Sequence, residues 1–278
     1  MRLQYYINEG IDKGIFIESL TLIYDKCYPF IKELLQYKFK PNDDLLYSGR
    51  DKTADYFKGR VRSDRKPRDI NEEIQELFDK EFYKRFKVRF RSNSIFCTGD
   101  YEQASSYGSN VYAIFPIGKY KYAWSPVVYD LFTDIVDNPK YDDYINDDIS
   151  DPMAIDNAID NKIDDMYNEY LRNYDQDEDD YIEYDDFKDE HIDAIIDEVT
   201  DELLDNLKYE VESEVSEIVD TYKDNKLKDA IISHNEIMVN CKEYIGIHEQ
   251  WFDYLKQYFS VYGNKKPTKE IIEDIRNW

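Results

Sequence analysis

The sequence predicts an α+β protein with a compact mixed β-sheet, helices at the N-terminus and an acidic helical insertion. Three observations lead to this fold class. Apolar residues recur at steps of three or four between positions 11 and 38, as in a helix. Short apolar runs between turn residues occupy 45–47, 95–98, 111–117 and 120–124, and such runs return at 236–240 and 244–247. A long acidic stretch with a helical period lies between the two groups of strands.

The acidic stretch dominates the charge of the chain. The formal net charge is −25 over 278 residues, yet positions 134–220 alone hold 33 acidic and 5 basic residues. The rest of the chain keeps 28 of the 61 acidic residues and 31 of the 36 basic ones. We therefore predict three parts. Residues 1–136 form the N-terminal helices and the first part of the body, residues 137–225 the insertion, and residues 226–278 the final strands and a C-terminal helix.

The order of the elements follows from local patterns. Lys40-Pro-Asn-Asp43 ends the first helical region, and the basic residues 50–69 predict a long loop. Apolar spacing predicts a helix over 71–86, two amphipathic helices over 152–174 and 190–222, and a last helix over 251–262. Each amphipathic helix has one apolar stripe opposite an acidic face. The two stripes can therefore pack against each other or against the body.

The composition also bears on location. No apolar run reaches the roughly 18 residues of a membrane span, and the N-terminus lacks the apolar core of a signal peptide. Cys27, Cys97 and Cys241 lie far apart, without the paired spacing of metal ligands. We expect a cytoplasmic protein with buried, reduced thiols.

The most informative stretch is Arg91-Ser-Asn-Ser-Ile-Phe-Cys-Thr-Gly-Asp-Tyr-Glu-Gln-Ala-Ser-Ser-Tyr-Gly108. Its apolar residues predict a strand that ends at Thr98-Gly99-Asp100. Asp100 can then cap a short helix that stops at Gly108. Another apolar strand begins at Val111. A strand, a hydroxyl-bearing turn, a helix and a second strand in this order favour a pocket-forming core.

This order resembles the second conserved region of the ADP-ribosyltransferase fold, where an aromatic-x-Ser/Thr turn precedes a helix ending in an aromatic-Gly pair. The wider run from Leu46 to Leu131 is similar to uncharacterised proteins of tailed bacteriophages. The resemblance covers roughly a third of the chain and rests on the order of its pieces. These are Leu46-Tyr-Ser-Gly49, Asp64-Arg-Lys-Pro-Arg-Asp69, Phe96-Cys-Thr98, Tyr107-Gly108, Phe115-Pro-Ile-Gly118 and Trp124-Ser125.

The resemblance implies an NAD-dependent mono-ADP-ribosyltransferase that modifies a macromolecular acceptor. For a phage-encoded chain the acceptor would be a host protein in the host cytoplasm. Glu236, which opens a strand, would be the catalytic residue, because a fixed carboxylate stabilises the oxocarbenium-like state formed as the nicotinamide–ribose bond breaks. Thr98 would orient that carboxylate. His234 departs from the family, which has Gln or Glu two positions before the catalytic residue.

The resemblance also implies residues that bind NAD, which is a substrate here. Ser48 stands where the family's first region ends in Arg or His. Arg50, two positions on, would then bind the diphosphate, because guanidinium donates paired hydrogen bonds to phosphate oxygens. Arg65 and Arg91 are alternatives for this charge. Tyr107 could stack on the nicotinamide. The residues assigned to NAD binding are Ser48, Arg50, Phe96 and Tyr107.

Each assignment has a purely structural alternative. Glu236 can be a solvated residue at a strand edge, and Thr98 can cap the end of a strand. Tyr107 can be an ordinary core aromatic, and each arginine can be a surface residue.

A second class of function follows from the acidic stretch. Regular negative charge on helices can imitate nucleic acid, so the chain can be a non-enzymatic inhibitor that binds a basic partner in a salt-dependent way. If the chain is instead an ADP-ribosyltransferase, the acceptor that it modifies would also be a basic or nucleic-acid-binding protein. We expect no membrane binding and no direct DNA binding by the acidic segment. A third alternative is that the acidic residues only keep a tyrosine-rich chain soluble.

One acidic run resembles a calcium-binding EF-hand loop. Asp175-Gln-Asp-Glu-Asp-Asp-Tyr-Ile-Glu-Tyr-Asp-Asp186 places oxygen-bearing side chains at loop positions 1, 3, 5, 9 and 12. Asp180 stands where the sharp turn prefers glycine, and Asp186 is one methylene shorter than the usual Glu. Calcium binding is therefore an alternative only, and the predicted site includes no metal.

Overall fold

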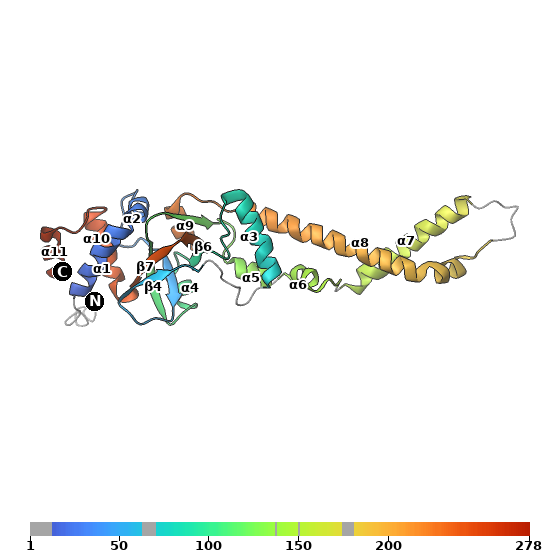
Figure 1. Cartoon of the computed structure of the whole chain (residues 1–278), viewed down its shortest axis with the longest axis horizontal. Helices are drawn as coiled ribbons and strands as arrows, with labels where there is room; N and C mark the ends of the chain where they lie inside the picture. The colour runs from blue at the N-terminus through green and yellow to red at the C-terminus, as the bar shows by residue number, and fades with distance from the viewer. Residues whose placement is uncertain (1–12, 63–70, 137, 150, 174–180) are drawn as a thin grey trace. The chain divides into compact units, whose positions relative to one another are not determined.

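The computed structural model describes residues 13–62, 71–136, 138–149, 151–173 and 181–278 (Figure 1). The chain is an α+β protein, as the sequence predicts, and it divides into two compact units. One unit comprises residues 1–131 and 218–278, and we call it the body. The other comprises residues 132–217, and we call it the acidic unit. Each is described by itself. That the acidic unit is an inserted domain, with the bounds predicted from the sequence, stays a prediction.

The body contains two antiparallel sheets rather than the single mixed sheet predicted from the sequence. The first sheet has the order β1-β4-β7-β2, and the second has the order β3-β6-β5. Their strands are β1 (Tyr47–Arg50), β2 (Tyr56–Arg60), β3 (Ile95–Cys97), β4 (Asn110–Pro116), β5 (Tyr120–Trp124), β6 (Ile237–Cys241) and β7 (Glu243–His248).

Two tight connections explain why the prediction of one sheet was wrong. Only Lys242 separates β6 from β7, yet the two strands pair with different neighbours. Gly118, with φ +69°, lies between β4 and β5, which also belong to different sheets. This left-handed conformation suits glycine, which has no Cβ. The chain therefore changes sheet at each turn, instead of continuing one sheet as a simple hairpin would.

The two sheets meet at the ends of β1 and β3. The N–H of Tyr47 donates to the carbonyl of Thr98 at 2.7 Å, and the N–H of Thr98 donates back at 2.9 Å. The Ser48 hydroxyl donates to the carbonyl of Phe96 at 2.8 Å. A large apolar core packs beside this junction. Its fully buried members include Phe16, Phe30, Tyr112, Phe115, Ile237, Ile247, Trp251, Leu255, Tyr258 and Phe259.

The helices of the body depart from the prediction in three places: helices α9 (Leu227–Ser233) and α11 (Lys269–Arg276) were not predicted, and the first helical region is divided. The single helical region predicted over 11–38 is two helices, α1 (Lys13–Lys26) and α2 (Tyr28–Leu34). Proline occupies the first turn of α2 because a helix start needs no N–H there. The remaining helices of the body are α3 (Glu72–Phe86), α4 (Tyr101–Ser105), η2 (Glu249–Trp251) and α10 (Phe252–Tyr262). Helix α5 (Leu131–Val136) begins at the last residue of the body and otherwise belongs to the acidic unit.

Part of the segment predicted as a loop over 50–69 is strand β2. Lys58 and Arg60 extend from this edge strand and form ion pairs with Glu243 of β7, at 2.9 and 3.7 Å. An edge strand has charged, half-exposed side chains, so it lacks the apolar run by which the other strands were recognised. The helix predicted over 71–86 is confirmed as α3, and Asn71 caps it by accepting a hydrogen bond from the N–H of Glu73.

The acidic unit is helical. It contains α6 (Pro139–Asn146), α7 (Pro152–Asn173) and most of α8 (Tyr184–Asp220). The predicted helices over 152–174 and 190–222 correspond to α7 and α8, and α8 begins six residues earlier than predicted. The two apolar stripes pack against each other through Ile159, Ile163, Ile195 and Val199. Among the described residues, no helix is both long and apolar enough to cross a membrane.

Candidate functional site

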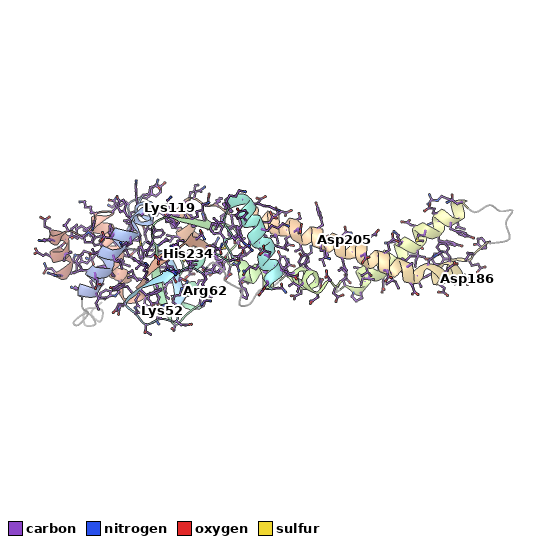
Figure 2. The ribbon with its side chains drawn as sticks, in the orientation of Figure 1. Lys52, Arg62, Lys119, Asp186, Asp205 and His234 are labelled. Atoms are coloured by element: carbon purple, nitrogen blue, oxygen red, sulfur yellow. The ribbon has the colours of Figure 1, made fainter. Side chains whose placement is uncertain are left out.

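The predicted catalytic residues lie at one end of the second sheet. Cys97 of β3 pairs with Ile237 of β6 in an antiparallel register, so the next residues, Thr98 and Glu236, leave the sheet at the same end. The backbone N–H of Glu236 donates to the carbonyl of Tyr129 at 2.8 Å. Segments that are far apart in the sequence therefore converge on Glu236. Figure 2 labels His234, two residues before it.

The Thr98 hydroxyl acts on the backbone beside Glu236. It donates to the carbonyl of His234 at 2.9 Å and accepts from the N–H of Asp100 at 3.0 Å. Because a hydroxyl has a single proton, this geometry gives that proton to the main chain rather than to the Glu236 carboxylate. His234 itself has φ +62°, and its Nε2 lies 3.2 Å from a carboxylate oxygen of Asp44. Thr98 thus fixes the turn that leads into Glu236.

The carboxylate of Glu236 contacts Arg91. Nη1 of Arg91 lies 3.3 Å from Oε1 and 3.4 Å from Oε2 of Glu236. The side chains are only 7% and 12% exposed, so this ion pair is largely shielded from water. The guanidinium carbon lies 4.8 Å from the centre of the Phe96 ring, which adds a cation–π contact. Phe96, one of the predicted NAD-binding residues, thus presents one face to Arg91.

A buried carboxylate holds the backbone at Arg91. Asp79 of α3 is fully buried and accepts from the N–H of Arg91 at 2.8 Å. It also accepts from the N–H and the hydroxyl of Ser92. Burial raises the pKa of Asp79, and the hydrogen bonds from Ser92 and Arg91 together with the charge of Arg89 oppose that rise. The turn before β3 is thereby tied to α3.

Tyr107 joins the same neighbourhood through its hydroxyl. Tyr107 is 60% exposed, while its hydroxyl donates to the buried carboxylate of Asp130. The pKa of Tyr107 is raised, first by desolvation and then by the hydrogen bond and charge of Asp130, and the charge of Glu236 adds to the rise. The structural alternative of a core aromatic does not describe this ring.

Arg50 approaches the site from the first sheet. Its guanidinium carbon lies 6.0 Å from the centre of the Tyr244 ring. Its Nε–H is buried and has no hydrogen-bond partner among the residues that the structure describes. Burial raises the pKa of the Cys97 thiol, the charge of Arg50 lowers it, and Cys241 and Glu236 raise it further. Arg50 and Glu236 thus both act on one buried side chain.

Two glycines bring β1 against the end of α4. A Cβ at Gly49 would lie 2.1 Å from the carbonyl oxygen of Ala104, and one at Gly108 would lie 2.2 Å from the N of Arg50. Only residues without a Cβ allow this approach. The Ser48 hydroxyl is engaged by Phe96, as described above, so it supports the junction of the sheets.

Other segments of the resemblance also reach this region. Trp124 pairs with Ile237, and the carbonyl of Ser125 accepts from the side-chain amide of Asn235 at 2.8 Å. Residues 64–69 lie outside the described residues. Within the described residues, no group of three or more His, Cys, Asp or Glu side chains could hold a metal ion. Residues 175–180 of the EF-hand-like run are also outside them, so calcium binding stays an untested alternative.

The sequence interpretation missed the roles of Asp79, Asp130 and the Arg91–Glu236 pair. Asp79 carried a usable signal: it lies one helical turn from Gln75 and close to Phe82 on the buried face of α3, where an ionisable side chain needs partners. Asp130 carried none, because it precedes an unremarkable helix in a region rich in aspartate.

Comparison of the chain with models of protein families, with curated proteins and with solved structures finds no match.

Proposed function

We propose that this protein is an NAD-dependent mono-ADP-ribosyltransferase. The observation that carries the proposal is the convergence on Glu236: its carboxylate, paired with Arg91, lies at the end of β6 that Thr98 also reaches. The residues come from positions up to 145 apart in the chain. NAD would be the substrate that donates ADP-ribose, and the acceptor would be a macromolecule. If the chain is phage-encoded, we propose that the acceptor is a basic host protein.

The proposed chemistry needs one fixed anion. As the bond between nicotinamide and ribose breaks, its electron pair leaves with nicotinamide and positive charge develops on the ribose ring. The Glu236 carboxylate would stabilise that charge, because a pre-oriented anion in a shielded site needs no reorganisation during the reaction. The acceptor nucleophile would then bond to the anomeric carbon and release its proton to water. Glu236 contacts Arg91 directly, and the Thr98 hydroxyl donates to the carbonyl of His234, so the predicted orienting role of Thr98 would act through the backbone of the preceding turn.

The other assigned residues fit NAD unequally. Arg50 has a buried, unpaired Nε–H among the described residues, as a group reserved for an anion such as the diphosphate would have. The Ser48 hydroxyl and one face of Phe96 already have partners in the protein. Tyr107 keeps a largely exposed ring, so it is the aromatic residue that we assign to nicotinamide stacking.

Substitution of Glu236 tests the proposal. Glu236→Gln keeps the shape of the side chain but removes its charge, so transfer of radiolabelled ADP-ribose from NAD to protein should fall by about 10²-fold or more. Binding of NAD in calorimetry should change little. Glu243→Gln is the matched control, because Glu243 opens the neighbouring strand β7 and pairs with Lys58. Equal labelling by the wild-type and Glu236→Gln proteins would reject the assignment of Glu236.

A second candidate function rests on the acidic unit. Four of its five basic residues already form ion pairs within the unit, through Lys140, Lys162, Lys188 and Lys208. The acidic unit holds many more carboxylates than basic residues. Asp186 and Asp205 of α8 are exposed (Figure 2). A basic, nucleic-acid-binding protein would suit this surface. Co-elution with such a protein at 50 mM salt, lost at 500 mM, would support this function.

A further inference from the structure

We infer that Arg91 is a positioning residue: it fixes the Glu236 carboxylate in one place and so prepares it for catalysis. The catalytic part of this inference rests on the proposed function. The pairing itself does not, because it follows from the geometry of the two side chains alone.

The contact is specific in its geometry. One nitrogen of Arg91 lies almost equally far from both carboxylate oxygens of Glu236, at 3.3 and 3.4 Å. Both side chains are largely buried, so water screens their attraction weakly. Phe96 supports the guanidinium from a ring centre 4.8 Å away. The guanidinium is thus held between an aromatic ring and the carboxylate.

The main chain at Arg91 is also held, so the pairing has a rigid base. Asp79, fully buried in α3, accepts hydrogen bonds from the N–H groups of both Arg91 and Ser92. The order of contacts runs from α3 through Asp79 and Arg91 to Glu236. Glu236 is fixed at its own backbone by the hydrogen bond to Tyr129. Held at both ends, the carboxylate has little freedom to move.

This arrangement decides between two roles for Arg91. As a ligand of the NAD diphosphate, it would have to leave Glu236 and take the guanidinium charge away from a shielded carboxylate, which is costly. Arg50 already offers an unpaired Nε–H for the anion among the described residues. A positioning residue and a diphosphate ligand differ in what they change: the first affects the chemical step, and the second affects binding of NAD.

The test compares Arg91→Met and Arg91→Lys with the wild-type protein. Release of nicotinamide from NAD gives kcat, and calorimetry gives the affinity for NAD. For Arg91→Met we expect kcat to fall by about 10- to 100-fold, because a carboxylate displaced by about 1 Å loses roughly that much rate. The affinity for NAD should change less than about threefold. Arg91→Lys keeps the charge, so it should recover part of kcat. Unchanged kcat with a large loss of NAD affinity would overturn the inference.

A second measurement tests the pairing without any enzymatic activity. Thermal melting of the wild type, Arg91→Met, Glu236→Gln and the double variant forms a double-mutant cycle. Each single variant removes one member of the shielded Arg91–Glu236 pair, whereas the double variant removes both. The double variant should therefore melt well above the temperature expected from adding the two single losses. Additive losses would show that the two residues do not interact, and the inference would be wrong.

The two measurements separate the possible failures. A wild-type protein that neither binds nor cleaves NAD, combined with a non-additive cycle, would reject the proposed function and retain Arg91 as the residue that fixes Glu236. Should Arg91→Met fail to fold, Arg91→Lys and Arg91→Gln replace it in both measurements. A loss of kcat in these variants without a loss of NAD affinity supports the inference, and the reverse pattern overturns it.

Discussion

Carboxylates in the body and in the acidic unit have opposite surroundings. Asp79 and Glu236 of the body are shielded from water and have specific partners in Arg91 and Ser92. Carboxylates of the acidic unit such as Asp205 lie on the exposed face of a long helix. The same chemical group is therefore used for precise placement in one region and as bulk surface charge in the other. The comparison predicts that substitutions will have unequal effects in the two regions.

The largest effect should come from the buried carboxylate. Asp79→Ala removes the acceptor for two backbone N–H groups and one hydroxyl, so the free energy of unfolding should fall by roughly 3 kcal/mol. Asp205→Ala on α8 is the matched control and should change it by less than about 0.5 kcal/mol. Urea denaturation followed by tryptophan fluorescence measures both. Similar losses in the two variants would remove the distinction between the regions.

Removal of the acidic unit should separate the two functions. Replacing residues 137–217 with a flexible Gly-Ser linker deletes most of the negative charge but none of the residues around Glu236. We expect the truncated protein to melt cooperatively and to keep NAD cleavage, and to lose binding of a basic partner. Residues 218–222 must stay, because Tyr222 is buried against Phe82 and Thr221 contacts Ser125. An unfolded truncation would show that the body requires the helices of the acidic unit.

Salt should affect the two regions differently. Exposed like charges in the acidic unit repel one another, and ions screen charges beyond about 10 Å at 0.1 M. Raising the salt concentration from 0.05 to 0.5 M should therefore slow amide hydrogen exchange in α7 and α8. Exchange in β4, β6 and β7 should change little. Faster exchange of α7 and α8 at high salt would mean that their ion pairs, rather than the repulsion, dominate.

The smallest effect concerns thiols, all three of which lie in the body. Burial raises the pKa of Cys27 and of Cys241 to about 12, and Cys97 is buried as well. At pH 8 only roughly 10⁻⁴ of such a thiol is the reactive thiolate. We expect no reaction of the native protein with a disulfide reagent within minutes. Met153→Cys, at an exposed position of α7, should react at once. Rapid labelling of a native cysteine would show that the body opens easily.

The sequence predicted most of the local structure of the body but not how its strands combine. Periodic apolar residues identified α3, α7 and most strands, because burial of one face dictates such patterns. The division into two sheets depends on the turns at Gly118 and Lys242, and a propensity for strand does not specify which strands pair. Strand β2 was missed because it lies at an edge and is charged.

The catalytic and NAD-binding roles of the candidate residues stay predictions, and the structure shows only how their segments are arranged. Glu236 and Thr98 were placed near each other by their resemblance to family regions, and their segments do converge. The partner of Glu236 was not predicted, because Arg91 is 145 residues away and its role depends on Asp79 fixing the turn. Such long-range pairing arises from tertiary structure, which a local pattern does not encode.

The most direct test of the account is a crystal structure of the Glu236→Gln protein with NAD. We predict that the diphosphate contacts Arg50 and that the side-chain amide at position 236 lies within hydrogen-bond distance of the nicotinamide ribose, with Tyr107 against the nicotinamide ring. Arg91 should remain beside position 236 rather than bind the phosphates. The assignment of Glu236 as the catalytic carboxylate would be contradicted by NAD bound elsewhere. It would also be contradicted if no NAD bound at a concentration that saturates NAD cleavage by the wild-type protein in solution.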